Sequence, residues 1–393
     1  MAPHVGLDAK PQQPDLQASR GARAKPIRAA LILYVDSAHV GGSLRVGEVL
    51  GRNLAGHSVE PHFIFAYGGP GPVSEGASAN CHFLGARGAR DFAAWRRARR
   101  LVRSLNPDVL HFVNPVFWMA LALSGSKRPK VLHVHGPMQP RDAKLTDRFI
   151  WRAFRHLMNA SICVSHDMET KLLAAGWGQP DRTWTIYNAV DCDRWAVRFD
   201  KAEARARLGL PEDARLLGMV CRLHATKGCD DGIRLLAHLP AKYHLAIAGE
   251  GPEKQNLAAL AASLGVAGRL HLLGLLNDTR LAYSAMDYLL FLSRTEPFGL
   301  LLAEAMAAGV PIVGLSGDGG YREEPNPLVT PDTAALLERP QPFDWAAAAP
   351  APLIEALAAR VQQFEENPDF RAAFAKRGQE RVRARFDAGK FAA

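Results

Sequence analysis

This sequence of 393 residues lacks the features of several common protein classes. No run of 18 apolar residues occurs, and the nearest candidate, residues 109–123, contains His111, Asn114 and Pro115, which argues against a transmembrane helix. No C-x-x-C pair occurs either. The five cysteines therefore indicate small buried side chains in a reducing compartment rather than disulfides or a zinc site: Cys81, Cys163, Cys192, Cys221 and Cys229.

The N-terminal end lacks the apolar segment of a signal peptide. Residues 1–26 are rich in Pro, Gln, Ala and charged residues, and this composition predicts a disordered leader. The whole chain is 48% hydrophobic, enough for two domains with cores of their own. This composition fits a large soluble enzyme.

Positive charge is in excess and gathers in two places. The net charge is +9, from 48 Lys and Arg against 39 Asp and Glu. Seven arginines and one aspartate lie between Arg87 and Arg103, and residues 147–158 alternate arginines with aromatic side chains. Such stretches suit an anionic membrane surface, but they are equally typical of a solvated arginine face over packed aromatics. No nucleic-acid motif accompanies them, so nucleic acid is not expected as a partner.

Short apolar runs alternate with helical stretches, which is typical of a parallel sheet covered by helices on both faces. In the first half, the expected strands are residues 27–35, 57–65, 108–113, 130–134 and 160–164. In the second half, which begins near Lys201, they are residues 215–221, 244–248, 270–272, 288–292 and 310–315. Prolines interrupt the pattern after Tyr321, and two helices are expected at 353–365 and 370–385.

Residues 293–313, SRTEPFGLLLAEAMAAGVPIV, carry the most specific pattern. Seven residues separate Glu296 from Glu304, and Gly309 lies at the expected end of the intervening helix. Pro297 is expected in the first turn of that helix, whose free amides would face an anion. Eight helical steps extend about 12 Å, whereas the carboxylates of a glycosidase lie roughly 5–9.5 Å apart. The spacing therefore favours two contacts to one elongated ligand over hydrolysis.

Other motifs precede this stretch in an informative order. Gly41 and Gly42 come before the first long helix, and His135 follows a strand in VLHVHG. The turn NAVD comes next. Arg222 and Lys227 then lie in CRLHATKG, and AGEGPE follows them.

The order of these motifs over residues 27–315 resembles that of the family-four group of retaining nucleotide-sugar glycosyltransferases, also called glycosyl transferases group 1. The resemblance implies an α/β architecture with the GT-B fold, in which two Rossmann-like domains face each other across a cleft. It implies an N-terminal acceptor-binding domain at 27–198 and a C-terminal nucleotide-sugar-binding domain at 199–377. The C-terminal helix, about 378–393, is expected to cross back to the first domain.

The same resemblance implies which residues act. Four are expected at the catalytic centre: Arg222, Lys227, Glu296 and His135. Six more are expected to bind the donor: Gly41, Gly42, Phe298, Gly299, Leu300 and Glu304. A guanidinium and an ammonium group suit a diphosphate because they meet the negative charge that develops on this leaving group. A buried core position is the alternative for His135, and it is the expected one for His133.

The implied activity is a retaining, metal-independent transfer of a sugar from a nucleotide-diphosphate-sugar to a glycan or lipid-linked acceptor, as in cell-surface polysaccharide or lipopolysaccharide synthesis. No cofactor and no metal are expected. The implied location is cytoplasmic, and peripheral binding at the inner face of the membrane is an option that the basic stretches leave open. Two alternatives remain open. One is a sugar-nucleotide epimerase on the same fold, and the other is a non-catalytic sugar- or membrane-binding protein.

The chain departs from the family pattern in three places. Ala189 stands where glycine is usual in the NAVD turn, and residues 341–352 form a Pro/Ala-rich segment without a counterpart. The usual glycine-rich blocks after the glutamates are replaced by GLSGDGGYREEPNPLVTPD. Gly319 and Gly320 are still expected near the phosphates. These departures affect the far edge of the nucleotide pocket.

Overall fold

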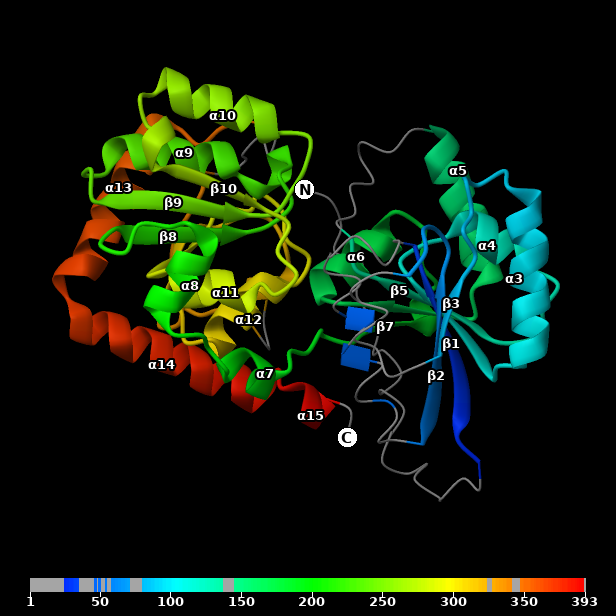
Figure 1. Ribbon diagram of the computed structural model, residues 1–393. Helices are drawn as coiled ribbons and strands as arrows, with labels where there is room; N and C mark the ends of the chain where they lie inside the picture. Colours follow the sequence, from blue (N-terminus) through cyan, green and yellow to red (C-terminus); the bar gives the residue numbers. More distant parts are fainter. Residues whose placement is uncertain are drawn as a thin grey trace, which may run out of the picture. The chain divides into compact units, whose positions relative to one another are not determined.

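The computed structural model describes residues 25–34, 46–47, 49–50, 54, 58–70, 80–136, 145–323, 327–340 and 347–391. Almost all of the expected leader lies outside these residues, and so do Gly41 and Gly42. The described part of the chain forms two compact units, each built on its own parallel sheet (Figure 1).

The first unit contains a seven-stranded sheet in the order β3-β2-β1-β4-β5-β6-β7, with every neighbouring pair parallel. Its strands are β1 (Ile27–Leu33), β2 (Val59–Phe65), β3 (Asn80–Phe83), β4 (Val109–Val113), β5 (Lys130–Val134), β6 (Ala160–Cys163) and β7 (Thr183–Thr185). Its helices include α3 (Phe92–Leu105), α4 (Phe117–Ala122), α5 (Leu145–Phe154) and α6 (His166–Ala174), with short 3-10 turns η2 (Arg155–Leu157) and η3 (Pro180–Arg182). The apolar central strands are buried on both faces, as a doubly covered parallel sheet requires.

The second unit contains a six-stranded parallel sheet in the order β10-β9-β8-β11-β12-β13. Its strands are β8 (Arg215–Val220), β9 (Tyr243–Ala248), β10 (Leu270–Gly274), β11 (Tyr288–Phe291), β12 (Ile312–Leu315) and β13 (Ala335–Leu337). Helices α9 (Cys229–His238), α10 (Lys254–Ser263) and α13 (Ala351–Glu366) cover one face of the sheet. The other face is covered by α8 (Lys201–Leu208), α11 (Arg280–Ala285), α12 (Leu300–Ala307) and α14 (Pro368–Arg385) (Figure 1). The remaining elements are α7 (Cys192–Ala196), α15 (Ala388–Phe391), η4 (Ala225–Lys227), η5 (Ala267–Arg269) and η6 (Gly320–Arg322).

Two expectations about the glutamate-containing stretch are wrong. Helix α12 begins at Leu300 rather than at Pro297, so Glu296 precedes the helix and the estimate from eight helical steps does not apply. The cause is Gly299, whose φ of 89° places it outside the right-handed helical region at the N-cap. The expected helix end is confirmed, because Gly309 has a φ of 67°. Strands β3, β7 and β13 were not predicted from the sequence.

Both sheets reverse their strand order at one point. In the first unit the reversal lies between β1 and β4, and in the second it lies between β8 and β11. Open α/β sheets bind ligands outside the carboxyl ends of the strands at such a reversal. The segments that follow these four strands are therefore the places to look for a site.

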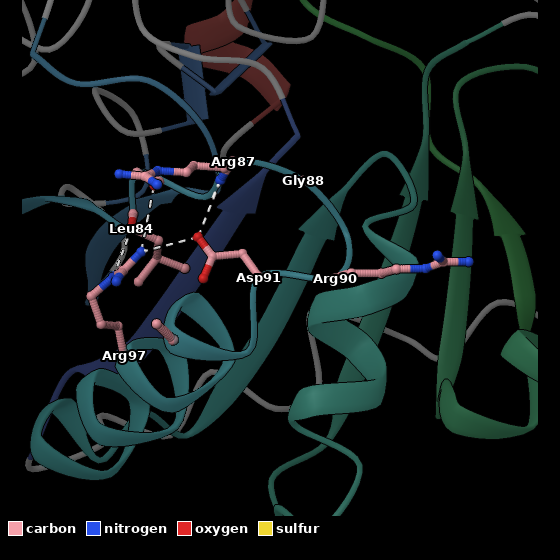
Figure 2. A pocket seen from close by; sticks show the side chains of 8 residues that line it. Leu84, Arg87, Gly88, Arg90, Asp91 and Arg97 are labelled. Carbon is pink, nitrogen blue, oxygen red and sulfur yellow. Dashed lines mark hydrogen bonds and ion pairs between the residues drawn. The ribbon is translucent and has the colours of Figure 1, made fainter.

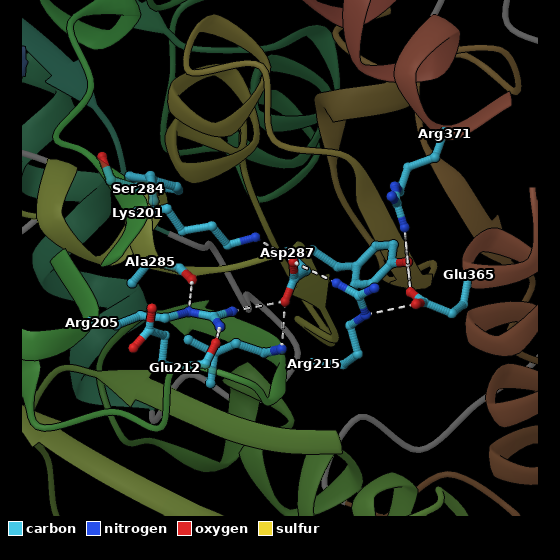
Figure 3. Close-up of polar contacts among 12 residues, drawn as sticks. Lys201, Arg205, Glu212, Arg215, Ser284, Ala285, Asp287, Glu365 and Arg371 are labelled. Carbon is cyan, nitrogen blue, oxygen red and sulfur yellow. Dashed lines mark hydrogen bonds and ion pairs between the residues drawn. The ribbon is translucent and has the colours of Figure 1, made fainter. Parts of the chain in front are cut away.

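A charged network at the opposite, amino end of β11 stabilises the second sheet (Figure 3). The side chain of Asp287 is only 8% exposed and accepts hydrogen bonds from Arg205 Nη2, at 2.9 Å, and from the amide of Leu216, at 2.7 Å. Lys201 forms a further ion pair with it. Burial alone would raise the pKa of Asp287, but these partners lower it overall. The network ties α8 to β8 and β11 and holds the two strands whose far ends carry the site.

Candidate functional site

The predicted cations and the first glutamate meet at the reversal between β8 and β11. Arg222 and Lys227 follow β8, and Glu296 follows β11, which is the parallel neighbour of β8. Lys227 Nζ lies 2.7 Å from Glu296 Oε2. Their side chains are 23% and 12% exposed, so the ion pair is largely shielded from water. The fold thus joins two residues that the sequence places 69 positions apart.

The ion pair keeps Lys227 charged. Burial would lower the pKa of this ammonium group, but the charge of Glu296 and its hydrogen bond raise the pKa overall. An arriving anion therefore meets an ammonium group that already has a carboxylate partner. It must compete with Glu296 for Lys227 or share it.

Arg222 supplies a second cation at the same edge of the sheet. Its side chain is exposed, and no described residue forms a hydrogen bond or an ion pair with its guanidinium group. Next to it, His224 Nδ1 lies 3.0 Å from Thr226 Oγ1. The loop therefore presents one free cation and one paired cation.

Behind this loop lies a buried charge cluster that sequence reasoning missed. Arg294 is 1% exposed, and its Nη2 lies 2.7 Å from Asp230 Oδ2 and 3.3 Å from Asp231 Oδ2. Its Nη1 donates to the carbonyl oxygen of Ala225 at 2.6 Å, and its amide donates to that of Thr226 at 2.8 Å. Arg294 thus fixes the backbone of η4, the turn that ends in Lys227. The only sequence signal was its place two residues before Glu296.

Close backbone contacts hold both site segments in place. A Cβ atom on Gly249 would lie 1.9 Å from the carbonyl oxygen of Cys221, so only glycine allows AGEGPE to pack against the cation loop. A Cβ atom on Gly319 would lie 1.8 Å from the carbonyl oxygen of Glu296, which explains a glycine there too. Gly319, expected near the phosphates, supports the segment that carries Glu296.

The remaining predicted donor-binding residues of this unit lie at and within α12. The ring of Phe298 is buried and packs 5.6 Å from that of Phe386, so only its backbone is left to bind a ligand. Gly299 caps the helix and Leu300 begins it. The first amides of a helix have no partner within it, and these can bind an anion. Glu304 is 8% exposed and accepts a hydrogen bond from Tyr283 Oη at 2.9 Å, a partner that the sequence did not reveal.

His135 belongs to the first unit and lies in a group of three histidines. The rings of His133 and His135 are centred 3.9 Å apart, and His133 Nδ1 lies 3.2 Å from His111 Nε2. Neither ring nitrogen of His135 has a hydrogen-bond partner among the described residues. Burial lowers the pKa of His111 to about 4 and that of His135 to about 3. Asn114 Oδ1 accepts from the amide of His135 at 2.9 Å and fixes the backbone at the end of β5.

The first unit also has an arginine-rich pocket where β3 leads into α3 (Figure 2). Its volume is about 800 Å³, and its lining consists of Leu84, Gly85, Arg87, Gly88, Arg90, Asp91, Ala93 and Arg97. Arg97 Nε donates to the carbonyl oxygen of Leu84 at 2.9 Å, and Asp91 Oδ1 caps the helix at the amide of Ala94. Arg90 points away from Arg87 and Arg97 (Figure 2). The pocket offers cations to an anionic ligand.

Two kinds of feature are absent from the part of the chain that the structure describes. No helix there is both long and apolar enough to cross a membrane. No group of three or more His, Cys, Asp or Glu side chains there has an arrangement suited to a metal ion.

Comparisons with known proteins cover both units. Residues 200–381 match the family model of glycosyl transferases group 1, and residues 40–194 match that of Glycosyltransferase Family 4. A lipopolysaccharide core biosynthesis glycosyltransferase of Rhizobium meliloti (strain 1021) is 37% identical over 115 residues, which are 29% of this chain and 34% of that protein. N-acetyl-alpha-D-glucosaminyl L-malate synthase of Bacillus anthracis is 26% identical over 314 residues, which are 72% of this chain and 80% of that protein.

A solved structure has the same architecture. The Anabaena protein HepE, in complex with UDP and glucose, superposes with a TM-score of 0.77 at 20% identity, over 92% of this chain and 96% of that chain. At this identity the likeness concerns the fold. It confirms the predicted α/β class and the GT-B architecture.

Proposed function

This chain belongs to the glycosyl transferases group 1 family and has the GT-B fold, and from that premise we propose that it transfers a sugar from a nucleotide-diphosphate-sugar to a glycan or lipid-linked acceptor. The observation that carries the proposal is the Lys227–Glu296 ion pair, which stands with Arg222 at the strand reversal of the second sheet. The named activities of the Rhizobium and Bacillus relatives and the UDP bound to HepE support it.

We further propose that the donor diphosphate binds to Arg222, Lys227 and the first amides of α12. As the bond between the sugar and the diphosphate breaks, both bonding electrons go to the phosphate oxygen, and these groups stabilise the charge. The acceptor hydroxyl attacks the same face of the sugar and gives its proton to the departing phosphate oxygen. The configuration at the anomeric carbon is thereby retained. The proposed role of Glu296 is to bind the transferred sugar, and that of Glu304 is to bind the ribose.

The first unit would supply the acceptor side. We propose that residues 27–198 bind the acceptor and residues 199–377 the donor. Gly41 and Gly42 are proposed to support the donor phosphates. His135, whose lowered pKa makes it a neutral imidazole, is proposed to form hydrogen bonds with the sugar. The Arg87 and Arg97 pocket would suit a negatively charged group on the acceptor.

A labelled-donor screen tests the function against its two alternatives. The purified protein is incubated with labelled UDP-, GDP- and TDP-sugars, with and without a membrane extract. A transferase moves label into the extract only when protein, donor and acceptor are all present. Donor conversion without extract would instead identify an epimerase, and binding without any turnover would identify a non-catalytic sugar-binding protein.

We also propose that the first unit docks on an anionic membrane surface at the inner face of the membrane. On α5, Phe149 is 76% exposed and Ile150 is 43% exposed, and Arg148 and Arg152 beside them are exposed as well. Exposed aromatic and aliphatic side chains flanked by arginines suit the headgroup region of a bilayer. Each basic residue near an anionic surface contributes about 1 kcal/mol, less at high salt.

The structure sharpens the choice of arginines for a liposome test. Arg97 and Arg99 donate to the carbonyl oxygens of Leu84 and Ala122, so their replacement would also disturb the fold. A better variant changes three exposed residues of α3 to glutamate: Arg96, Arg100 and Arg103. The matched control makes the same charge change at three exposed cations of the second unit: Arg207, Lys242 and Lys376. We expect only the α3 variant to lose low-salt pelleting with anionic liposomes. Equal pelleting of both variants would contradict membrane docking through α3.

A further inference from the structure

Two cysteines stand at the two ends of the loop that carries the cations. Cys221 directly follows β8, and Cys229 is the first residue of α9. Between them lie Arg222, the η4 turn and Lys227. Cys221 Sγ and Cys229 Sγ are 3.6 Å apart, and both residues are free thiols in this structure. The sequence alone had indicated only small buried side chains.

The distance between the two sulfur atoms is short enough for a bond to form without a rearrangement of the fold. A disulfide has an S–S length of about 2.05 Å, so the sulfur atoms must approach by about 1.5 Å. Rotation of the two side chains and a small movement of the loop would provide this approach.

The two thiols differ in a way that suits thiol–disulfide exchange. Cys221 is partly exposed, whereas Cys229 is 2% exposed. The hydrogen bond with Cys229 lowers the pKa of Cys221, and the nearby ammonium of Lys227 lowers it further against the effect of burial. The pKa of Cys229 is raised by its hydrogen bond with Cys221 and by burial. Cys221 is therefore the accessible nucleophile, and Cys229 is placed to resolve a mixed disulfide.

We propose that Cys221 and Cys229 form a reversible disulfide that inactivates the cation loop, with a small-molecule disulfide such as oxidised glutathione as the oxidant. The effect on activity rests on the proposed function, whereas the bond itself does not. The two cysteines flank Arg222 and Lys227 in the chain, and these are the cations proposed to bind the donor phosphates.

The exchange balances in two steps. The thiolate of Cys221 attacks one sulfur of the small disulfide, forms a mixed disulfide and releases one small thiolate. The thiolate of Cys229 then attacks Cys221 Sγ and releases the second small thiolate. The two protons lost by the cysteines go to the two released thiolates. The protein is oxidised by two electrons, and one small disulfide is reduced to two thiols.

The backbone of the loop has to adjust when the two sulfur atoms move together. The amide of Cys221 is fixed to the carbonyl oxygen of Ala248 at 3.0 Å. At the other end, a Cβ atom on Gly228 would lie 2.4 Å from the carbonyl oxygen of Leu292, so the backbone there is tightly packed. Between these two ends, Arg294 holds the carbonyl oxygens of Ala225 and Thr226, so closing the bond has to strain the contacts that position Lys227. Lys227 is then drawn away from Glu296, and the diphosphate loses a correctly placed cation.

The test treats the full-length protein with oxidised glutathione and measures three quantities. Peptide mapping is decisive for the bond, because trypsin cleaves after Arg222 and Lys227 and the disulfide must join two separate peptides. Hydrogen exchange over residues 222–228 reports on the loop without any donor. Sugar transfer and UDP binding report on activity. Cys229→Ser is the test variant, and Cys81→Ser, which removes another partly exposed cysteine, is the matched control.

We expect the Cys221–Cys229 link in the wild type and in Cys81→Ser, its absence in Cys229→Ser, and its reversal by dithiothreitol. Oxidation should change hydrogen exchange in the loop and lower turnover about tenfold or more. Absence of the link, or a link that leaves both loop exchange and turnover unchanged, would overturn the proposal. If the reduced protein transfers no sugar, the proposed function fails, while mapping and hydrogen exchange still decide the switch.

Discussion

The two sheets share one strand order, apart from the additional edge strand β7 in the first, yet the residues at their reversal points are chemically different. In the second unit, β8 and β11 lead to Arg222, Lys227 and Glu296, which are charged. In the first unit, β4 leads to the neutral Asn114, whose Oδ1 accepts from the amide of His135 at the end of the neighbouring strand β5. One scaffold thus supports a site suited to a diphosphate and a site suited to neutral hydrogen bonds.

Burial has opposite outcomes at the two sites because only one of them contains countercharges. Arg294 is buried, and burial alone would lower its pKa, but Asp231 and Asp230 raise the pKa overall. No acidic side chain in the described part of the chain pairs with His111, His133 or His135, and burial lowers the pKa of all three. Buried ionisable groups are paired or become neutral. The following variants test whether each outcome has the cause assigned to it.

Removal of Arg294 should have the largest effect. Arg294→Met keeps much of the side chain's volume but leaves Asp230 and Asp231 without one of their cations and frees the carbonyl oxygen of Ala225. Breaking a buried ion pair costs about 3–5 kcal/mol. We expect a loss near 3 kcal/mol in urea unfolding, because Arg339 still pairs with Asp231. Turnover should fall as well, since η4 loses its anchor. Unchanged stability would show that the cluster does not support the loop.

Lys227→Ala should have the next largest effect, and it acts on the chemistry rather than on the fold. The variant removes a cation whose contact strengthens as the diphosphate leaves, so kcat should fall on the order of 10²-fold, about 2.7 kcal/mol. Initial rates with a saturating donor measure this. Lys254→Ala is the matched control, because Lys254 pairs with Glu250 at 2.9 Å but on the exposed surface. Near-normal turnover of Lys227→Ala would exclude the assigned role.

The histidines should produce a smaller effect that depends on pH. Their pKa values lie near 4 for His111 and near 3 for His135, below the value of about 6.5 in an unfolded chain. Above pH 6.5 these histidines are neutral in both the folded and the unfolded state, so no stability is lost to their protonation. As the pH falls below 6.5, only the unfolded chain binds protons, so stability is lost by up to about 1.4 kcal/mol per pH unit for each histidine.

Urea unfolding at pH 7 and at pH 5 measures this loss. His135→Gln should reduce the difference in the free energy of unfolding between pH 7 and pH 5 by the contribution of one histidine. If the difference is the same in the variant and the wild type, His135 titrates normally and is not buried in a neutral form.

The sequence predicted the strands well but missed contacts that depend on tertiary structure. Apolar runs such as residues 130–134 became strands because burial on both faces leaves a strong pattern. Strand β13 has three residues near several prolines and left no such pattern. The helix start was wrong because Gly299 can be read as part of a helix or as its cap, and only its φ decides.

In the candidate site too, the sequence predicted individual residues but missed the tertiary contacts between them. Motif order identified Lys227 and Glu296 separately, but their ion pair follows from the adjacency of β8 and β11. Arg294 was missed because a sequence does not distinguish a buried charge from a solvated one. Tyr283 was missed because it reaches Glu304 from α11, a different helix. The roles proposed for the ten site residues stay predictions, and those of Gly41 and Gly42 lie outside the described residues.

The smallest expected effect is that of removing divalent metal. In the proposed mechanism, Arg222, Lys227 and the amides at the start of α12 meet the charge of the leaving diphosphate, a task that a bound Mg²⁺ performs in other transferases. Transfer rates measured with EDTA should therefore equal those measured with Mg²⁺. Lys227→Ala sharpens the comparison, because a variant that lacks the ammonium should gain more from added Mg²⁺ than the wild type does. A strict metal requirement in the wild type would mean that these cations do not carry the charge, and the division between a charged and a neutral reversal point would then need a different chemical explanation.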